Sequence, residues 1–380
     1  MRSMENPKHN LSRQKLDGSK YKVIHTESSL GWGGQEIRII HEAQQLQIKG
    51  FTVCIVANRD SEIAQRAKAL GITVIEARIR KKRFIDLISV FRLLTKQRPD
   101  IVCSHSSTDH WLVALARLLS RKRYKIIRGR HISARIKNSL PNKWLYRFGC
   151  DYVYTTAEFI TEQFRSLNLV SEARIQTVPT GIDLGYFKHG DRLSARSALG
   201  IPETAFVLGT ISTLRSWKGH RYAIEAVKQS KLKNLLFLIV GTGPQEEALK
   251  QLVADSGLPN VRFYGHQDDI RIFLDALDCF IFPSYANEGV PQALLQAMAY
   301  DLPIITTHFP PLVETLVGYK KAYFSEPESE ESLCEGLQYI FTRQYDDARA
   351  SNSRPPSVRD FSLEKMANVM EAIYLKVAKS

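Results

Sequence analysis

The stretch FPSYANEGVPQALLQAMAYDLPIITT, residues 282–307, carries the most structural information in this chain of 380 residues. Its apolar runs predict a buried strand that ends at Pro283, a polar loop that contains Glu288, and a helix that starts near Pro291. Proline suits the first turn of a helix because its missing N–H is not needed there. A second apolar run, PIITT, follows, so the stretch is typical of a strand–helix–strand unit in a parallel sheet.

The start of this helix is a candidate anion site. The free N–H groups of a first helical turn, together with the helix dipole, favour a diphosphate. Glu288 stands just before the turn, and Gln296 follows eight positions later. That spacing is about 12 Å along a helix, the scale of a nucleotide sugar, so one side chain would hold sugar hydroxyls and the other a ribose. The alternative without a function is that Glu288 only caps the helix.

Outside this stretch, short apolar runs alternate with longer segments of helical periodicity, as in β-α-β units around a parallel sheet. The segment IQTVPTGIDLGYF, residues 175–187, combines Pro, Gly and Asp and indicates a connection. We therefore expect an α/β chain with two Rossmann-like, doubly wound domains that face a central cleft, where the loops after the strands bind a shared ligand. The expected parts are a disordered start (1–18), a first domain (19–185), a second domain (186–361) and a last helix (362–380) that packs back on the first domain.

The predicted strands and helices fall into two similar sets. In the first set, strands are expected at 21–26, 51–57, 72–77, 100–106, 125–130 and 152–157, with helices at 36–48, 61–70, 85–96 and 110–120. In the second set, strands are expected at 206–212, 235–241, 261–265, 279–284 and 303–307, with helices at 222–229, 245–256, 270–277 and 291–299.

Composition favours a globular protein of the cytoplasm. Hydrophobic residues make up 44% of the chain and charged residues 24%, enough to form a core. The five cysteines are scattered in apolar stretches without metal or disulfide spacing, so we expect them buried in a reducing compartment. No apolar run approaches the roughly 20 residues that span a bilayer, and the first residues lack the apolar segment of a secretory signal.

The formal net charge is +14, with basic clusters at Lys81–Arg83 and along Arg117–Arg130. Such a charge is compatible with a solvated surface, with docking to an anionic membrane face, or with nucleic acid. Nucleic-acid binding would need a matching motif or interleaved aromatic residues, and the sequence contains neither. We therefore expect no nucleic-acid partner, and a peripheral position at the inner face of the plasma membrane stays open.

Residues 282–307 resemble the signature of retaining glycosyltransferases of family 4, the group 1 glycosyltransferases with the GT-B fold. That signature has two glutamates separated by seven residues, followed by Ala-Met-Ala; here the first is Glu288, and Gln296 stands in place of the second. The resemblance implies metal-independent transfer from a nucleoside diphosphate sugar, with retention, to a carbohydrate or glycolipid acceptor. In the family the second glutamate accepts bonds from the ribose hydroxyls. An uncharged amide at that position predicts weaker donor binding or a changed pose.

Two further segments of the second half resemble the family. LGTISTLRSWKGH, residues 208–220, matches the segment that meets the donor phosphates: Lys218 and Gly219 fit directly, and Arg215 is our candidate cation because Thr213 occupies the usual arginine position. Fixed cations neutralise a departing diphosphate, the role of a metal ion in other transferases. LFLIVGTGP and VRFYGHQDDI resemble a glycine turn and the loop around the nucleotide base, and we interpret Asp268–Asp269 as a helix start rather than a metal site.

In the first half, SLGWGGQE resembles the family's glycine-rich loop, VPTGID resembles its hinge motif with Thr180 in place of Asn, and His131 falls where a histidine often faces the sugar. A lone histidine is more often structural, which is how we interpret His105. The resemblance and the residues together predict the following site. The expected catalytic residues are Glu288, Lys218, Arg215 and His131; the donor-binding residues are Gly289, Val290, Gln292, Gln296, Gly243 and Gly265; and the phosphate or acceptor loop contains Gly33 and Gly34.

We expect the acceptor to be a membrane-associated envelope glycolipid, such as lipopolysaccharide core or a related polysaccharide. Two other functions stay open at this point. One is a sugar-nucleotide epimerase of the same fold, which needs catalytic carboxylates and histidines that the sequence does not place. The other is a non-catalytic protein that binds nucleotide sugars, which Gln296 and Thr213 make conceivable.

Overall fold

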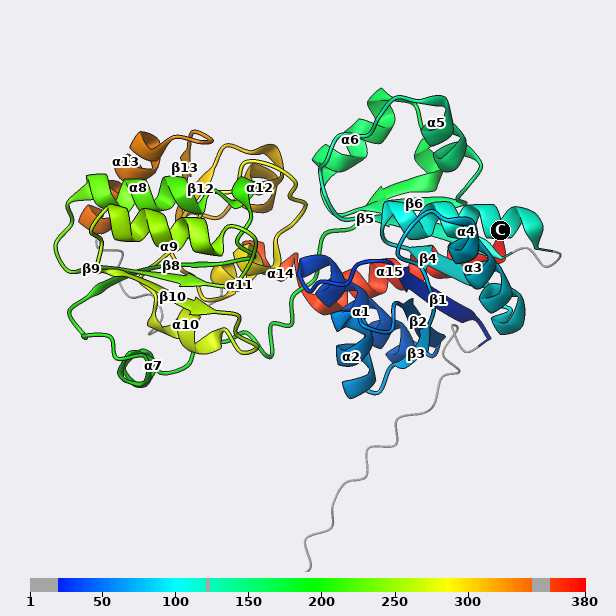
Figure 1. Ribbon diagram of the computed structural model, residues 1–380, viewed down its shortest axis with the longest axis horizontal. Coiled ribbons are helices and arrows are strands. Elements are labelled where there is room, and N and C mark those ends of the chain that lie inside the picture. The colour runs from blue at the N-terminus through cyan, green and yellow to red at the C-terminus, as the bar shows by residue number, and fades with distance from the viewer. Residues whose placement is uncertain (1–19, 121–123, 344–355) are drawn as a thin grey trace, which may run out of the picture.

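The computed structural model describes residues 20–120, 124–343 and 356–380. In these residues two parallel sheets, of seven and six strands, are flanked by helices (Figure 1). The predicted α/β architecture with two Rossmann-like units is confirmed. The expected disordered start, residues 1–18, lies outside the described residues.

The first sheet has the strand order β3-β2-β1-β4-β5-β6-β7. The order changes direction between β1 and β4, and such a switch point leaves a crevice at the carboxyl ends of both strands. The strands are β1 Lys22–Glu27, β2 Thr52–Ala57, β3 Thr73–Glu76, β4 Ile101–Ser104, β5 Lys125–Arg130, β6 Tyr152–Thr155 and β7 Ile175–Thr177, and the helices are α1 Gly34–Ile48, α2 Glu62–Ala69, α3 Phe84–Gln97, α4 Ser107–Leu119, α5 Leu140–Arg147 and α6 Glu158–Ser166.

The second sheet has the order β10-β9-β8-β11-β12-β13, with its switch point between β8 and β11. The loops that follow these two neighbouring strands carry Lys218 and Glu288, so the topology brings the two predicted site segments to one crevice. The strands are β8 Phe206–Ile211, β9 Leu235–Val240, β10 Val261–Gly265, β11 Cys279–Phe282, β12 Ile304–Thr307 and β13 Ala322–Ser325, and the helices are α7 Arg192–Ala198, α8 His220–Ser230, α9 Glu246–Asp255, α10 Arg271–Ala276, α11 Gln292–Ala299, α12 Pro310–Thr315, α13 Glu330–Arg343 and α14 Pro356–Arg359.

Every predicted strand is present, but several elements were not predicted: α5, α6, β7, α7, α12, β13, α13 and α14. The five short helices among them have nine residues or fewer, too few for a clear 3.6-residue period, and the two strands are too short for a clear alternation. Helix α13, with 14 residues and buried positions such as Leu333, Leu337 and Ile340, has a recognisable period and was missed nonetheless.

The last helix, α15 (Leu363–Lys379), packs against α1 of the first sheet (Figure 1). Met366, Met370 and Tyr374 belong to a core of that domain, and Glu371 pairs with Lys49, the residue that follows α1, at 2.9 Å. The chain thus returns to the first domain after the second sheet is complete.

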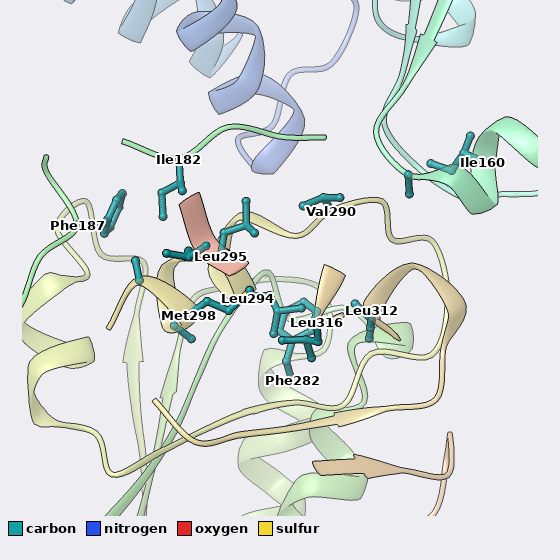
Figure 2. Close-up of a cluster of buried hydrophobic side chains, with 14 of the residues drawn as sticks. Ile160, Ile182, Phe187, Phe282, Val290, Leu294, Leu295, Met298, Leu312 and Leu316 are labelled. Carbon is teal, nitrogen blue, oxygen red and sulfur yellow. The ribbon is translucent and has the colours of Figure 1, made fainter. Parts of the chain in front are cut away.

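The predicted core face of α11 is confirmed: Leu294, Leu295 and Met298 are fully buried. Figure 2 shows them in one apolar cluster with Ile182 and Phe187 of the connecting segment. This packing fixes α11, and with it the loop before α11. All five cysteines are buried and unpaired, as predicted.

Candidate active site

The centre of the site is an ion pair between the two loops of the second switch point. Lys218 Nζ lies 2.6 Å from Glu288 Oε1, and Ser284 Oγ lies 2.5 Å from the same oxygen. Both charged side chains are largely buried, with exposed fractions of 15% for Lys218 and 7% for Glu288. A buried pair with this geometry holds both groups in fixed positions.

Gly219 explains why a Lys-Gly sequence is needed here. Its φ is +74°, and a Cβ at this position would lie 2.1 Å from the carbonyl oxygen of Pro283. Only glycine combines this left-handed backbone with so close an approach. The short 3₁₀ turn Ser216–Lys218 is therefore pressed against the loop after β11, where Tyr285 N donates to Trp217 O at 3.0 Å.

A cavity of about 850 Å³ opens beside this pair and is lined by both domains. Ten of the twelve predicted site residues line it, and the first domain contributes the glycine-rich loop and His131. The ten are Gly33, Gly34, His131, Arg215, Lys218, Glu288, Gly289, Val290, Gln292 and Gln296.

Gly243 and Gly265, which we expected to bind the donor, do not line the cavity. A Cβ on Gly243 would lie 2.5 Å from Leu214 O, so this glycine is needed for packing. Gly265 has φ +64°, and its carbonyl accepts from Gly241 N at 2.7 Å, which ties β10 to β9. Their neighbours line the cavity instead: Gly241, Thr242, His266 and Gln267.

Helix α11 starts at Gln292, with Pro291 as its N-cap, so Glu288 precedes the helix by one loop. The predicted separation of about 12 Å from Glu288 to Gln296 assumed helical rise throughout and does not hold, because four of the eight steps are not helical. The first turn of α11 carries no acidic residue, which leaves its amide groups and dipole available to an anion.

Arg215 lines the cavity from the second domain and His131 lines it from the first. The Arg215 guanidinium lies 5.3 Å from the Trp217 ring centre, and no ion pair joins it to another described residue. Burial lowers the pKa of His131 well below its ordinary value, and the positive charges of Arg38 and Arg128 lower it further. His131 is therefore a neutral imidazole at physiological pH.

An ion pair at the cavity rim was not predicted from the sequence. Arg66 of α2 pairs with Asp268 of the second domain at 2.7 Å, and its guanidinium lies 4.6 Å from the ring centre of Trp32. Asp269, in contrast, accepts from Arg271 N at 3.0 Å at the start of α10. The helix-start interpretation therefore holds for Asp269, while Asp268 joins the two domains.

The loop with Glu288 also contacts the first domain directly. Ser133 N donates to Glu288 O at 3.0 Å. A second contact between the domains lies at α6, where the Glu314 carboxylate accepts from Glu158 N at 2.6 Å and from Phe159 N at 3.1 Å. The two domains are thus closed over the cavity.

In the described part of the chain, one His/Cys/Asp/Glu group has metal-ligand spacing: His25, Cys103 and His105. All three are buried, and none of them lines the cavity. Among the described residues, none of the helices combines the length and apolar character required to cross a bilayer.

Comparisons with known proteins cover both halves of the chain. The family model for glycosyl transferases group 1 matches residues 191–354, and the model for glycosyltransferase family 4 matches residues 32–186. The crystal structure of a glycosyltransferase from Rickettsia africae superimposes with a TM-score of 0.82 at 22% identity, covering 95% of this chain and 99% of that one.

Two curated relatives are glycosyltransferases that are named for different products. The UDP-Gal:alpha-D-GlcNAc-diphosphoundecaprenol alpha-1,3-galactosyltransferase of Escherichia coli is 24% identical, covering 94% of this chain and 97% of its own. The lipopolysaccharide core biosynthesis glycosyltransferase LpsE of Rhizobium meliloti is 25% identical over 61% of this chain, and the chain spans just under two thirds of that relative's length (64%). The chain belongs to the group 1 glycosyltransferases and has their two-domain GT-B fold.

Proposed function

We propose that this glycosyltransferase moves a sugar from a nucleoside diphosphate sugar to a membrane-associated envelope glycolipid, with retention of the anomeric configuration. The observation that carries the proposal is the Lys218–Glu288 pair at 2.6 Å in the wall of a cavity that both domains line. The cavity volume of about 850 Å³ suits a nucleotide sugar, since ligand pockets span roughly 300–1,000 Å³.

The second domain would bind the diphosphate. Lys218 and Arg215 would neutralise the charge that develops on the leaving group, and the first turn of α11 would add its free amide groups. Gln296, on the same helix and at the cavity wall, would hold the ribose through its amide. No metal ion is required in this arrangement, because the cations are supplied by side chains.

The sugar would lie between the domains. Glu288 would orient its hydroxyls, and His131 would meet it from the first domain. Closure of the domains would complete this site and exclude water, which limits hydrolysis of the donor. The proposal that the anomeric configuration is retained rests on the family resemblance of residues 282–307.

The acceptor proposal rests on the relatives and on the first domain. One relative is named for a lipid-linked diphosphoundecaprenol acceptor and another for lipopolysaccharide core biosynthesis. The glycine-rich loop with Gly33 and Gly34 lies at the first-domain wall of the cavity, where an acceptor would enter. Glycine lets backbone amides approach such a substrate closely.

A basic and apolar face of the first domain would dock on the membrane. Its exposed cations include Lys81, Lys82 and Arg83 before α3 and Arg135, Lys137 and Arg147 around α5, and the sequence from His110 to Cys150 contains no Asp or Glu. Phe84 and Leu140 are 77% and 81% exposed. Lys82 lies 5.7 Å from the Trp111 ring, and Trp111 stacks on Trp144 at 5.9 Å, so α3, α4 and α5 form one surface.

The reaction is tested with a panel of nucleoside diphosphate sugars and extracted membrane glycolipids. Free nucleoside diphosphate should appear only when an acceptor is present, whereas an altered sugar nucleotide without acceptor would indicate an epimerase. Glu288→Gln should abolish transfer, and Glu247→Gln, a carboxylate that is 91% exposed, is the matched control. Full activity of Glu288→Gln, or failure of every nucleotide to bind, contradicts the proposal.

Membrane docking is tested by sedimentation with vesicles. The protein should bind phosphatidylglycerol vesicles and not phosphatidylcholine vesicles, because each basic residue near an anionic surface contributes about 1 kcal/mol. Phe84→Ser with Ile85→Ser should weaken binding, while Leu193→Ser, an exposed leucine of the second domain, should not. Equal binding to both vesicle types refutes an anionic docking surface.

A further inference from the structure

Three buried histidines form a hydrogen-bonded chain that ends at the cavity. His25 Nδ1 lies 2.9 Å from His105 Nε2, and His105 Nδ1 lies 3.0 Å from His131 Nε2. Their imidazole rings are stacked at centroid distances of 5.2 Å. Of the three, only His131 lines the cavity, so the chain links the cavity wall to the interior of the first domain.

All three imidazoles are neutral. Burial is the largest cause that lowers the pKa of each of them, and for His105 the neighbouring imidazoles and the charge of Arg128 act in the same direction. A neutral imidazole has one N–H and one acceptor nitrogen. The proton positions in the chain are therefore coupled: fixing one of them fixes the other two.

Tyr154 fixes the direction of the chain. Its hydroxyl donates to Glu42 Oε2 at 2.9 Å, and the other carboxylate oxygen of Glu42 accepts from Tyr374 of α15 at 2.8 Å. Tyr154 has no second hydrogen, so towards His105 Nδ1, at 3.4 Å, its oxygen can only accept. The proton of His105 is thus favoured on Nδ1, where it is donated to His131 Nε2 and to the Tyr154 oxygen.

The remaining protons follow from this position. His105 Nε2 must accept, so His25 donates from Nδ1. His131 Nε2 must also accept, so the single N–H of His131 is on Nδ1. His131 Nδ1 is shielded from solvent and has no hydrogen-bond partner among the described residues, and a buried donor without a partner costs about 1–3 kcal/mol. His131 lines the cavity, and a substrate oxygen that reaches Nδ1 from there would remove that penalty.

We infer that His105 and His25 are positioning residues that fix His131 as a donor through its Nδ1–H, so that the substrate group bound there is an oxygen acceptor. The inference rests on the proposed function only for the identity of that group, a sugar hydroxyl or a phosphate oxygen. The proton positions themselves follow from contacts in the free protein.

A bound metal ion is the alternative explanation for the close approach of His25 and His105. The ligand atoms of these two residues and of Cys103 lie within 4.8 Å of one another. The distance of 2.9 Å between the facing nitrogens of His25 and His105 is that of a hydrogen bond. The hydrogen-bonded chain accounts for this distance without an ion, and metal analysis of the purified protein is one arm of the test.

The decisive experiment is ¹⁵N NMR of the histidine side chains in the free protein at pH 7.5, with the His131 resonances assigned by their loss in His131→Gln. We expect His131 with its hydrogen on Nδ1 and a bare Nε2. A hydrogen on Nε2, a charged imidazole, or bound metal in stoichiometric amount overturns the inference. Because this experiment uses no substrate, it stands even if the proposed function fails.

Two variants of similar shape test the positioning role. His105→Asn keeps a donor near the place of Nδ1, whereas His105→Leu has none. We expect His105→Leu to lose the Nδ1–H preference of His131 and at least about tenfold in kcat/KM, with UDP binding unchanged, and His105→Asn to restore most of both. Equal behaviour of the two variants contradicts the inference, and loss of UDP binding in both would instead indicate a structural role.

Discussion

Gly289 offers the sharpest test of how the two domains meet. A Cβ at this position would lie 2.1 Å from Thr156 Oγ1 and 2.4 Å from the carbonyl oxygen of His131, both in the first domain. Its φ is outside the left-handed region, so the backbone itself would accept alanine. Gly289→Ala therefore adds one methyl group to the interface between the domains and leaves the rest of the loop unstrained.

The magnitude follows from those distances. Both contacts would have to lengthen by about 1 Å or more, and the His131 oxygen belongs to the backbone, which cannot turn aside. Overpacking of this kind costs about 1–3 kcal/mol. Since the clash exists only when the domains are closed, this energy shifts the closed–open equilibrium by roughly 5- to 150-fold. The apparent KM for the donor should rise by up to the same factor, because it depends on the fraction of closed protein.

The assay compares donor KM, small-angle scattering and melting temperature. The radius of gyration should increase while the melting temperature changes by no more than about 3 °C, because opening relieves the clash without unfolding either domain. Gly31→Ala is the matched control and should change none of the three: its Cβ would lie 3.8 Å from Ser29 Oγ, an ordinary contact, and Gly31 does not line the cavity.

Thr156→Ala in the Gly289→Ala background adds a second check. It removes the hydroxyl contact and leaves the His131 carbonyl contact at 2.4 Å, so rescue should be partial at most. The reasoning is refuted if Gly289→Ala has the donor KM and the scattering profile of the parent protein. It is also refuted if the variant simply unfolds at a much lower temperature.

Three other predictions use different contacts. Glu314→Ala removes the carboxylate that accepts from Glu158 N and Phe159 N, a loss of about 1–2 kcal/mol in the closed form. We expect the donor KM to rise by up to about five- to thirtyfold, and an unchanged KM would contradict this. Gln296→Glu should tighten donor binding about tenfold in calorimetry, since a charged acceptor binds ribose hydroxyls more strongly; weaker binding would show that the ribose lies elsewhere. Burial, and then the charge of Asp109, raise the pKa of Glu27 from 4.5 to about 8, so its contribution to stability is complete below pH 4.5 and is lost as pH rises through about 8. Urea unfolding of Glu27→Gln should show a weaker decline between these pH values than the parent, and parallel curves would exclude Glu27 as the cause.

The sequence predicted those parts of the site that depend on local pattern. Lys218 and Glu288 were found because each follows a recognisable buried strand, and the switch point of a parallel sheet brings such loops together. Gly243 and Gly265 were expected at the donor and do not line the cavity. The sequence alone does not distinguish a glycine that packing requires from a glycine that lets the backbone approach a ligand. Only the 2.5 Å approach to Leu214 O distinguishes the first of them.

Contacts between the domains could not be predicted. Arg66 lies on an ordinary amphipathic helix, and its partner Asp268 is about 200 residues away, so no local period or motif relates them. The same holds for the histidine chain. His25 and His105 lie on or just after neighbouring strands, and the pairing of β1 with β4 that brings them together is a property of the fold.

One loop connects chemistry and closure in this enzyme. The side chain of Glu288 pairs with Lys218, its carbonyl accepts from Ser133 of the first domain, and the next residue, Gly289, lies against the backbone of His131. In the proposed reaction, a donor that moves Glu288 would therefore also move the interface, and a change at the interface would reach the proposed sugar site. For this reason substitutions at Gly289 should change donor binding and domain closure together, while a substitution at the exposed rim, such as Asp268→Asn, should change closure far more than chemistry.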